Sequence, residues 1–283
     1  MPVTTFDKII NTIRHTFDLD ANAEITLESN PGTIDAQKLS DFVLAGVNRL
    51  SVGVQRIDNT SLAFLGRRHD LAMAYNLLNA AQKLPIRLSA DFIYGLPGDT
   101  TETVTNMCRD INKIGLSHVS MYELTIEENT PFGKMNLDMP TNEQMADMYC
   151  TIAQELKLPR YEVSNYAAPG NECRHNQNVW YGGAYIGIGR GAAGRINING
   201  TWYEQMGDNA VFAPISPRDR AVEMIITGMR TTRGVAISHT IMQLINTEFI
   251  TKNPELVHMN DGYICATEKG MLILDDLLLK LVK

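Results

Sequence analysis

The sequence predicts an α/β fold, in which a partial parallel βα barrel is followed by a small α+β domain of winged-helix type. Between residue 4 and about residue 155, short apolar stretches alternate with helical patterns at intervals of about 25 to 35 residues, as in βα units. After about residue 140 this alternation stops. We therefore expect three parts: the partial barrel over 1–140, a barrel extension over 141–207 and the winged-helix-like domain over 208–283.

Each element of the first part follows from a local pattern. Apolar residues recur at helical spacing in residues 5–17, and the next helix has a suitable N-terminal cap in Asp35 and a stop in Gly46. The expected strands are 24–28, 49–54, 86–95 and 118–124. The expected helices are 5–17, 35–46, one that ends near residue 65, 70–83 and 100–114. Because the first element is a helix, the chain reads as if it started within a βα fold.

The second half of the chain gives a more irregular pattern. Asn199-Gly200 is a favoured two-residue turn, which predicts a β-hairpin over 195–204. The other expected elements are a helix at 141–157, a strand at 161–167, a loop rich in Gly, Asn and aromatics at 168–195, a linker at 208–217, helices at 218–229 and 239–249, a strand at 262–266 and a helix at 268–282. A winged-helix fold can bind DNA, but the apolar density of the last helix favours a packing role.

Composition excludes several classes of protein. With 44% hydrophobic and 20% charged residues the chain is neither disordered nor fibrous. A net charge of −7 over 283 residues argues against affinity for nucleic-acid phosphates or anionic lipids. No apolar run approaches the roughly 18 residues that a membrane span needs, and the N-terminus lacks a signal-peptide pattern, so we expect a cytoplasmic protein.

The four cysteines are scattered, at positions 108, 150, 173 and 265. None forms a C-x-x-C or similar pair, so they predict neither a disulfide framework nor a metal site. Free cysteines are often buried. We therefore expect reduced, structural thiols.

Polar residues stand at the ends of three consecutive expected strands. Ligands of a parallel βα barrel bind where the carboxyl ends of the strands converge. Glu28, Gln55 and Asp91 occupy such ends, and strand alternation should turn Glu28 into the barrel. Glu28 alone is equally well read as a solvated carboxylate, but the three together favour a shared ligand with hydroxyl or amino groups, such as a ribose or an amino acid.

Three further features are weaker. Arg67 and Arg68 follow a helix and can clamp a carboxylate or simply be solvated. The Gly-rich stretch 187–194 lacks the full dinucleotide-binding pattern and is better read as a turn that approaches a flat ligand. His175, beside Asn176 and Trp180, suits a haem or metal ligand or a hydrogen-bonded loop residue.

These segments resemble the radical S-adenosylmethionine proteins of the oxygen-independent coproporphyrinogen III oxidase type, and within them the HemW branch, regarded as haem chaperones. The segments that carry the resemblance stand in the family's order over nearly the whole chain: ITLESNPGT, AGVNRLSVGVQ, LGRRH, SADFIYGLPG, HVSMYELTIEENTPF, YEVSNYA, RHNQNVW, YIGIGRGA and TGMRTTRG.

The resemblance implies cofactor contacts for residues of this chain. S-adenosylmethionine would be contacted by Glu28, Gln55, Arg67, Asp91, and through the backbone near Thr125 and Ala193. The family's His-Asn-x-x-Tyr-Trp haem motif is matched at His175, Asn176 and Trp180, while Val179 takes the Tyr position, which leaves haem binding at His175 open.

The sequence departs from the family at its start. The cysteines of C-x-x-x-C-x-x-C, which hold a [4Fe–4S] cluster, and a Gly-Gly-Gly-Thr-Pro turn are both absent. We therefore expect a radical-SAM barrel that lacks its first two strands, no metal site, no catalytic residue on this chain and no activity by itself. Loss of these strands would leave strand 24–28 as an exposed edge. A disrupted gene, one half of a split protein and a truncated gene model are the three explanations.

The expected function is accordingly a HemW-like role in haem or porphyrin metabolism, as a haem-binding and haem-delivering protein. The alternatives are an oxygen-independent coproporphyrinogen III oxidase, which decarboxylates porphyrinogen propionates oxidatively, and a non-functional gene fragment. The expected partners are haem or a porphyrin, a missing N-terminal fragment, or a protein that accepts haem. No nucleic acid is expected among them.

Overall fold

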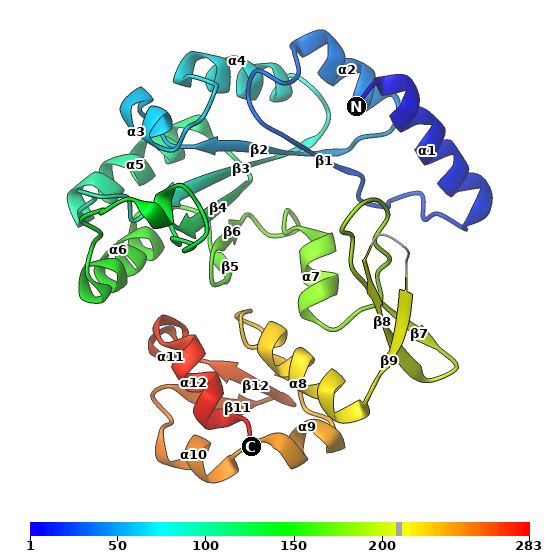
Figure 1. The fold of residues 1–283 in the computed structure, drawn as a ribbon, viewed down its shortest axis with the longest axis vertical. Coiled ribbons are helices and arrows are strands. Elements are labelled where there is room, and N and C mark those ends of the chain that lie inside the picture. Colours follow the sequence, from blue (N-terminus) through cyan, green and yellow to red (C-terminus); the bar gives the residue numbers. More distant parts are fainter. Residues whose placement is uncertain (208–210) are drawn as a thin grey trace. The chain divides into compact units, whose positions relative to one another are not determined.

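The computed structural model describes residues 1–207 and 211–283, which divide into two compact units (Figure 1). Unit 1 comprises Met1–Arg160 and Ser164–Glu172, and unit 2 comprises Tyr161–Val163 and Cys173–Lys283. The expected division into three parts, 1–140, 141–207 and 208–283, stays a prediction. No helix among the described residues is long and apolar enough to cross a membrane.

Unit 1 is built on a mixed sheet in the order β1-β2-β3-β4-β6. The first four strands are parallel, and β6 is antiparallel to β4. The strands are β1 (Thr26–Ser29), β2 (Arg49–Gln55), β3 (Arg87–Tyr94), β4 (His118–Glu123) and β6 (Asn165–Ala167). A further short strand, β5 (Arg160–Glu162), has residues in both units. The parallel strands confirm those predicted from the apolar stretches, within about two residues at each end.

The helices of unit 1 also follow the predicted alternation. They are α1 (Val3–Thr16), α2 (Ala36–Leu44), α3 (Asn59–Phe64), α4 (Leu71–Ala81), α5 (Thr101–Ile114), α6 (Asn142–Glu155) and the 3₁₀ helix η1 (Phe132–Lys134). In five of them a side-chain oxygen at the N-cap accepts a hydrogen bond from a backbone N–H of the first turn, which fixes where the helix begins. The N-cap residues are Asp35, Asp58, Asp70, Thr100 and Thr141.

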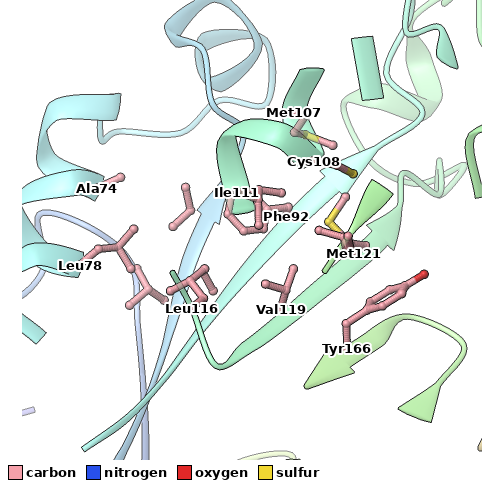
Figure 2. Packing of buried hydrophobic residues seen from close by; sticks show 14 of the residues in the cluster. Ala74, Leu78, Phe92, Met107, Cys108, Ile111, Leu116, Val119, Met121 and Tyr166 are labelled. Atoms are coloured by element: carbon pink, nitrogen blue, oxygen red, sulfur yellow. The ribbon is translucent and has the colours of Figure 1, made fainter. Parts of the chain in front are cut away.

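The core of unit 1 lies on one face of this sheet. Along β2, the side chains of Leu50, Val52 and Val54 alternate with polar ones and join the main hydrophobic cluster. Figure 2 shows Phe92 of β3 and Ile111 of α5 among the side chains gathered there. Every residue of β2 is buried, so both faces of the central strand are covered, as is usual for parallel sheets. The opposite face is left for polar side chains.

Unit 2 contains two small antiparallel sheets. The first has the order β7-β8-β9 and the second β10-β12-β11. Their strands are β7 (Gly194–Ile198), β8 (Thr201–Met206), β9 (Val211–Ile215), β10 (Val235–Ala236), β11 (Val257–Asn260) and β12 (Tyr263–Ala266). The helices are α7 (Arg174–Trp180), α8 (Pro217–Gly228), α9 (His239–Leu244), α10 (Thr247–Lys252), α11 (Glu268–Leu272) and α12 (Leu274–Leu281). The second sheet and the helices from α8 onward share one hydrophobic core, as expected of a domain of winged-helix type.

The hairpin predicted around Asn199-Gly200 is confirmed. It joins β7 to β8, and both turn residues have positive φ, 51° at Asn199 and 86° at Gly200. A turn with two positive φ angles matches the twist of the flanking strands. Asn and Gly tolerate this conformation best.

Two predictions for the middle of the chain are wrong. The single strand expected at 161–167 is two short strands, β5 and β6, and the loop expected at 168–195 contains helix α7. In the linker expected at 208–217, residues 208–210 lie outside the described residues, and the rest forms β9 and the start of α8. Pro214 is tolerated because β9 is an edge strand, paired only with β8 among the described residues.

Two predicted helices of unit 2 are each divided in two. The helix expected at 239–249 is α9 and α10, because the side chain of Asn246 accepts a hydrogen bond from the backbone of Phe249 and starts a new helix there. The helix expected at 268–282 breaks at Ile273, which has non-helical backbone angles. Apolar periodicity alone does not reveal such breaks, because it continues through them.

Candidate functional site

Polar side chains gather on the face of the unit 1 sheet that is opposite its core. In the strand register, Glu28 of β1 lies beside Ser51 of β2, Gly53 of β2 beside Asp91 of β3, and Asp91 beside Ser120 of β4. Successive residues of a strand point to opposite faces. These side chains therefore lie on the face opposite to the one that carries Leu50 and Val52. We call this surface, with Glu28, Ser51, Asp91 and Ser120, the polar face.

Asp91 is at the centre of the polar face. The Ser51 hydroxyl donates a hydrogen bond to Asp91 Oδ2 at 3.1 Å. Burial raises the pKa of the Asp91 carboxyl above its ordinary value, while hydrogen bonds from Ser120 and Ser51 act in the opposite direction. The negative charge of Glu28 raises this pKa further, and the positive charge of Arg49 lowers it. A ligand that donates hydrogen bonds to such a half-buried carboxylate would stabilise its charged form.

Gln55 reaches the same region through an unusual backbone conformation. It is buried, ends β2 and has a φ of 71°, in the left-handed region that few residues other than glycine adopt. A Cβ atom on Gly53 would lie 2.7 Å from both Gln55 Nε2 and Asn30 Oδ1. A larger residue at position 53 would displace the two amide groups from their present positions above β2. The structure therefore brings Glu28, Gln55 and Asp91 together, as the strand ends predicted.

Two polar residues stand at the start of neighbouring strands of this sheet. Thr26 of β1 and Arg49 of β2 are register partners. Thr26 Oγ1 is buried without a hydrogen-bond partner, and Arg49 is only 4% exposed. Among the described residues, no hydrogen bond or ion pair reaches the Arg49 side chain. Buried polar groups are normally satisfied, so Thr26 Oγ1 is an exception at the amino-terminal end of β1.

Beyond Arg49, the polar side chains satisfy one another. Arg87 Nη2 lies 2.6 Å from Glu24 Oε2 in an ion pair. His118 Nδ1 and Ser89 Oγ are 2.7 Å apart, and burial lowers the pKa of His118 to about 3. His118 is therefore a neutral imidazole at physiological pH. At the amino-terminal ends of the strands, these polar side chains therefore bind one another. We look for a ligand site at the carboxyl ends of the strands, where ligands of parallel βα folds bind.

The structure does not link Arg67 or Thr125 to these residues. Arg67 follows α3, and its Nε atom is buried without a hydrogen-bond partner. Thr125 is exposed and lies just beyond the carboxyl end of β4. No contact among the described residues joins either side chain to Asp91. Both remain predicted cofactor contacts.

The other two predicted contacts belong to unit 2. Ala193 is exposed and directly precedes β7. His175 is exposed near the start of α7, where its ring meets the ring of Tyr185 edge-on with centroids 6.4 Å apart. Trp180 ends the same helix and packs against Tyr161, with their ring centroids 6.0 Å apart. The segment 174–180 thus presents His175 on a helix rather than on the expected loop.

Sequence reasoning missed an ion pair beside the polar face. Arg56 directly follows β2, and its guanidinium makes two hydrogen bonds of 2.8 Å to the carboxylate of Asp99. Asp99 also accepts hydrogen bonds from the backbone N–H groups of Gly95 and Leu96, each at 3.0 Å. The pair fixes the loop that follows β3 against the end of β2. Arg49, Ser51 and Ser120 were missed as well, although strand alternation is a signal that places all three on the polar face.

The described residues do not fit an iron–sulfur cluster. Nowhere in 1–207 and 211–283 do three or more His, Cys, Asp or Glu side chains gather closely enough to hold a metal ion. Cys108 is buried in α5, where burial raises the pKa of its thiol to about 12. A neutral, enclosed thiol is a poor metal ligand.

The chain is similar in sequence to several known proteins. The model of the radical SAM superfamily matches residues 4–111. The heme chaperone HemW of Escherichia coli is 38% identical over 67% of this chain and 51% of its own length. The mitochondrial radical S-adenosyl methionine domain-containing protein 1 of Bos taurus is 30% identical over 98% of this chain and 72% of its own length.

A solved structure shows the same fold. Coproporphyrinogen III oxidase (HemN) from Escherichia coli matches with a TM-score of 0.75 over 99% of this chain and 74% of its own, at 19% identity. The chain spans about half the length of the HemW proteins of Escherichia coli and Haemophilus influenzae that it matches. From its sequence similarity to the bovine and HemW relatives, the chain belongs to the radical SAM superfamily, among the HemW-like proteins.

Proposed function

We propose that unit 1 binds S-adenosylmethionine at the carboxyl end of the polar face. The observation that supports this most is the convergence of Glu28, Gln55 and Asp91 from neighbouring strands. Carboxylates accept hydrogen bonds from ribose hydroxyls and from an ammonium group, and an amide can do both. In the same proposal Arg67 pairs with the methionine carboxylate, and the backbone near Thr125 contacts the cofactor. Ala193 belongs to unit 2 and stays a predicted contact.

We further propose that the chain serves haem or porphyrin metabolism by binding and delivering haem, with His175 as a ligand of the haem iron. Two observations support this part. The relatives in Escherichia coli and Haemophilus influenzae are heme chaperones. His175 is exposed on α7, so its imidazole is accessible from solvent.

The proposal stays with binding and includes no reductive cleavage of S-adenosylmethionine. In the family that step takes an electron from an iron–sulfur cluster held by three thiolates. The cysteines of unit 1 are Cys108 and Cys150, both on helices, and the described residues offer no third thiol beside them. Thiols other than these would have to hold the cluster.

Calorimetric titration with S-adenosylmethionine tests the first part. We expect binding by the wild-type chain and at least about tenfold weaker binding by the Glu28→Gln, Asp91→Asn double variant, because two hydrogen-bond acceptors lose their charge. The matched control removes two acidic charges from α5 through Glu102→Gln and Asp110→Asn. Equal binding by both double variants would remove the polar face as the site.

Absorption spectroscopy tests the second part. Addition of haem should produce a shifted Soret band in the wild-type chain, and His175→Ala should change its position or weaken it. The matched control is His258→Ala, because His258 is also an exposed histidine of unit 2. An identical spectrum and affinity in His175→Ala would show that His175 does not bind the iron.

A further inference from the structure

Unit 2 contains a cavity that the proposed S-adenosylmethionine and iron sites do not use. Its volume is about 120 Å³. Its walls come from the end of α7, from α8, from β10 with the loop before it, and from β12. The side chains that give it its character are Trp180, Tyr181, Met224, Arg233 and Tyr263. All of them belong to unit 2.

Arg233 is the charged residue of this cavity. Its guanidinium lies over two aromatic rings, 4.8 Å from the ring centroid of Tyr181 and 4.9 Å from that of Tyr263. It also donates a hydrogen bond to the Tyr263 hydroxyl. Stacking of this kind holds the planar guanidinium in one orientation. The cation is therefore in place before any ligand arrives.

The loop that carries Arg233 is fixed by its backbone. The carbonyl of Arg233 accepts a hydrogen bond from the thiol of Cys265 at 3.1 Å. Gly234 has a φ of 78°, and a Cβ atom at this position would lie 2.1 Å from the carbonyl oxygen of Ile264. No residue other than glycine fits so close to β12. This packing fixes the backbone from which the Arg233 side chain extends to the cavity.

The charge of Arg233 has no acidic counterpart nearby. Across residues 1–207 and 211–283, no Asp or Glu carboxylate forms an ion pair with its guanidinium. Arg233 is exposed, whereas the other walls of the cavity are aromatic, aliphatic or thioether groups. A guanidinium presents five N–H donors in a fork that matches a carboxylate. The cavity thus combines an unpaired cation at its mouth with an apolar interior.

The size of the cavity limits what it can take. Pockets that enclose a whole small-molecule ligand usually measure roughly 300 to 1,000 Å³, and about 150 Å³ is enough for a single benzene ring. A volume of about 120 Å³ therefore accommodates one edge of a larger ligand. The matching chemistry is a carboxylate on a short aliphatic arm beside a flat ring.

We propose that this cavity binds a propionate-bearing edge of the tetrapyrrole, with Arg233 pairing with the propionate carboxylate and the aromatic side chains contacting the ring. The inference rests on the proposed function, because it takes haem or a porphyrin as the ligand. It does not depend on His175, which lies five residues before Trp180 and so about 7.5 Å away along the axis of α7. Recognition of the propionate is thus separate from ligation of the iron.

The test compares protoporphyrin IX with its dimethyl ester, in which both propionates are uncharged. Neither molecule contains iron, so ligation by histidine does not contribute. Quenching of tryptophan fluorescence reports binding, and we expect the wild-type chain to bind the free acid roughly tenfold or more tightly than the ester, as for a lost charge-assisted pair. Arg233→Ala should bind both forms equally, at the affinity of the ester. Arg233→Lys should retain only part of the preference.

The matched control is Arg218→Ala. Arg218 is exposed on α8, lies outside the cavity and donates a hydrogen bond to the carbonyl of Lys283. The Arg218→Ala variant should keep the full preference for protoporphyrin IX over its dimethyl ester. Because Arg233 is exposed, Arg233→Ala should fold, and equal thermal melting of the two variants checks this.

The outcomes separate the inference from the proposed function. If the wild-type chain shows a haem Soret shift, and Arg233→Ala still prefers the free acid as strongly as the wild-type chain does, the cavity is not the propionate site and haem binding stands. If the wild-type chain binds neither haem nor protoporphyrin, the proposed function fails and this inference fails with it. Loss of the preference in Arg233→Ala alone supports the inference.

Discussion

Arg56 and Asp99 join the ends of two neighbouring strands through a buried, bidentate ion pair. Both N–O distances are 2.8 Å, and the two side chains are only 4% and 5% exposed. Arg56 follows β2 directly after Gln55, and Asp99 closes the loop that follows β3. The pair therefore sets the spacing between the carboxyl ends of β2 and β3, the two strands that carry Gln55 and Asp91.

Removal of one partner should be costly. Asp99→Ala leaves the buried Arg56 without its carboxylate, and breaking a buried pair in this way typically costs about 3 to 5 kcal/mol. Urea denaturation at pH 7 measures the loss in the free energy of unfolding. The control is Asp110→Ala, which breaks the exposed pair with Lys113 and should cost at most about 1 kcal/mol. Similar losses in the two variants would contradict the role given to Asp99.

The ionised Asp91 side chain should lower the stability of the fold and strengthen binding of S-adenosylmethionine. Burial raises its pKa in the native state above the ordinary 3.8. At pH values between 3.8 and the raised native pKa, Asp91 is protonated in the native state but ionised in the unfolded chain. The free energy of unfolding therefore falls as the pH rises through this interval. At pH 7 the ionised Asp91 is therefore unfavourable to the ligand-free fold.

Asp91→Asn should accordingly raise the free energy of unfolding at pH 7 and weaken binding of S-adenosylmethionine. Urea denaturation at several pH values from 7 down to 4 should show the gain shrinking as the pH approaches 3.8, and calorimetry gives the affinity. Asp110→Asn serves as the control for loss of an exposed charge. An Asp91→Asn variant that is less stable than the wild-type chain at every pH would refute this account.

His118 should make the fold sensitive to acid. Its native pKa of about 3 lies below the ordinary 6.5. The unfolded chain therefore takes up a proton as the pH falls through 6.5, while the native state does not until about pH 3, and stability is lost over this range. The slope from one such group is at most about 1.4 kcal/mol per pH unit.

His118→Gln should flatten that slope. Measurement of the free energy of unfolding between pH 6.5 and pH 4 gives the comparison with the wild-type chain. His239→Gln is the matched control, because His239 is exposed and should leave the slope unchanged. Parallel pH profiles for the wild-type chain and His118→Gln would mean that His118 is not the acid-sensitive group.

Substitutions at two adjacent residues of β2 should differ in their effects: one should lower mainly the stability, and the other should also weaken binding of S-adenosylmethionine. Leu50 is fully buried in the core, so Leu50→Ala should cost about 2 to 5 kcal/mol in the free energy of unfolding. Ser51 donates a hydrogen bond to Asp91, so Ser51→Ala should cost about 1 kcal/mol and weaken binding of S-adenosylmethionine. Denaturation and calorimetry on both variants test this, and weaker binding by Leu50→Ala at unchanged stability would contradict it.

Much of unit 1 could be predicted from the sequence because its signals are local. Apolar stretches bounded by capping residues such as Asp35 and Asp70 mark its strands and helices. Unit 2 was harder to predict. Helix α7 has seven residues, no side-chain cap at Cys173 and no buried residue, so neither caps nor periodicity reveal it. Strand β11 was missed, although Asp261-Gly262, with φ of 48° and 81°, is a favoured hairpin turn before β12.

The candidate site divides in the same way. Glu28, Gln55 and Asp91 could be predicted because a strand end is a local feature, and the register then brings them together. The pairing of Arg56 with Asp99 joins residues 43 positions apart and becomes visible only in three dimensions. The cavity around Arg233 has walls from four separate elements, which no single stretch of sequence reveals.

Strand β2 is buried along its whole length, and core side chains alternate with polar-face side chains up to Gly53, where the pairing with β3 shifts register. Over evolutionary time the two sets can change independently: a relative can acquire a different ligand by altering positions 49, 51, 53 and 55 while positions 50, 52 and 54 keep the domain folded. Insertions and deletions are a different matter. Because side chains alternate with a period of two, the loss of one residue from the middle of β2 would interchange the two sets beyond that point, so this strand should tolerate substitution far better than any change in length.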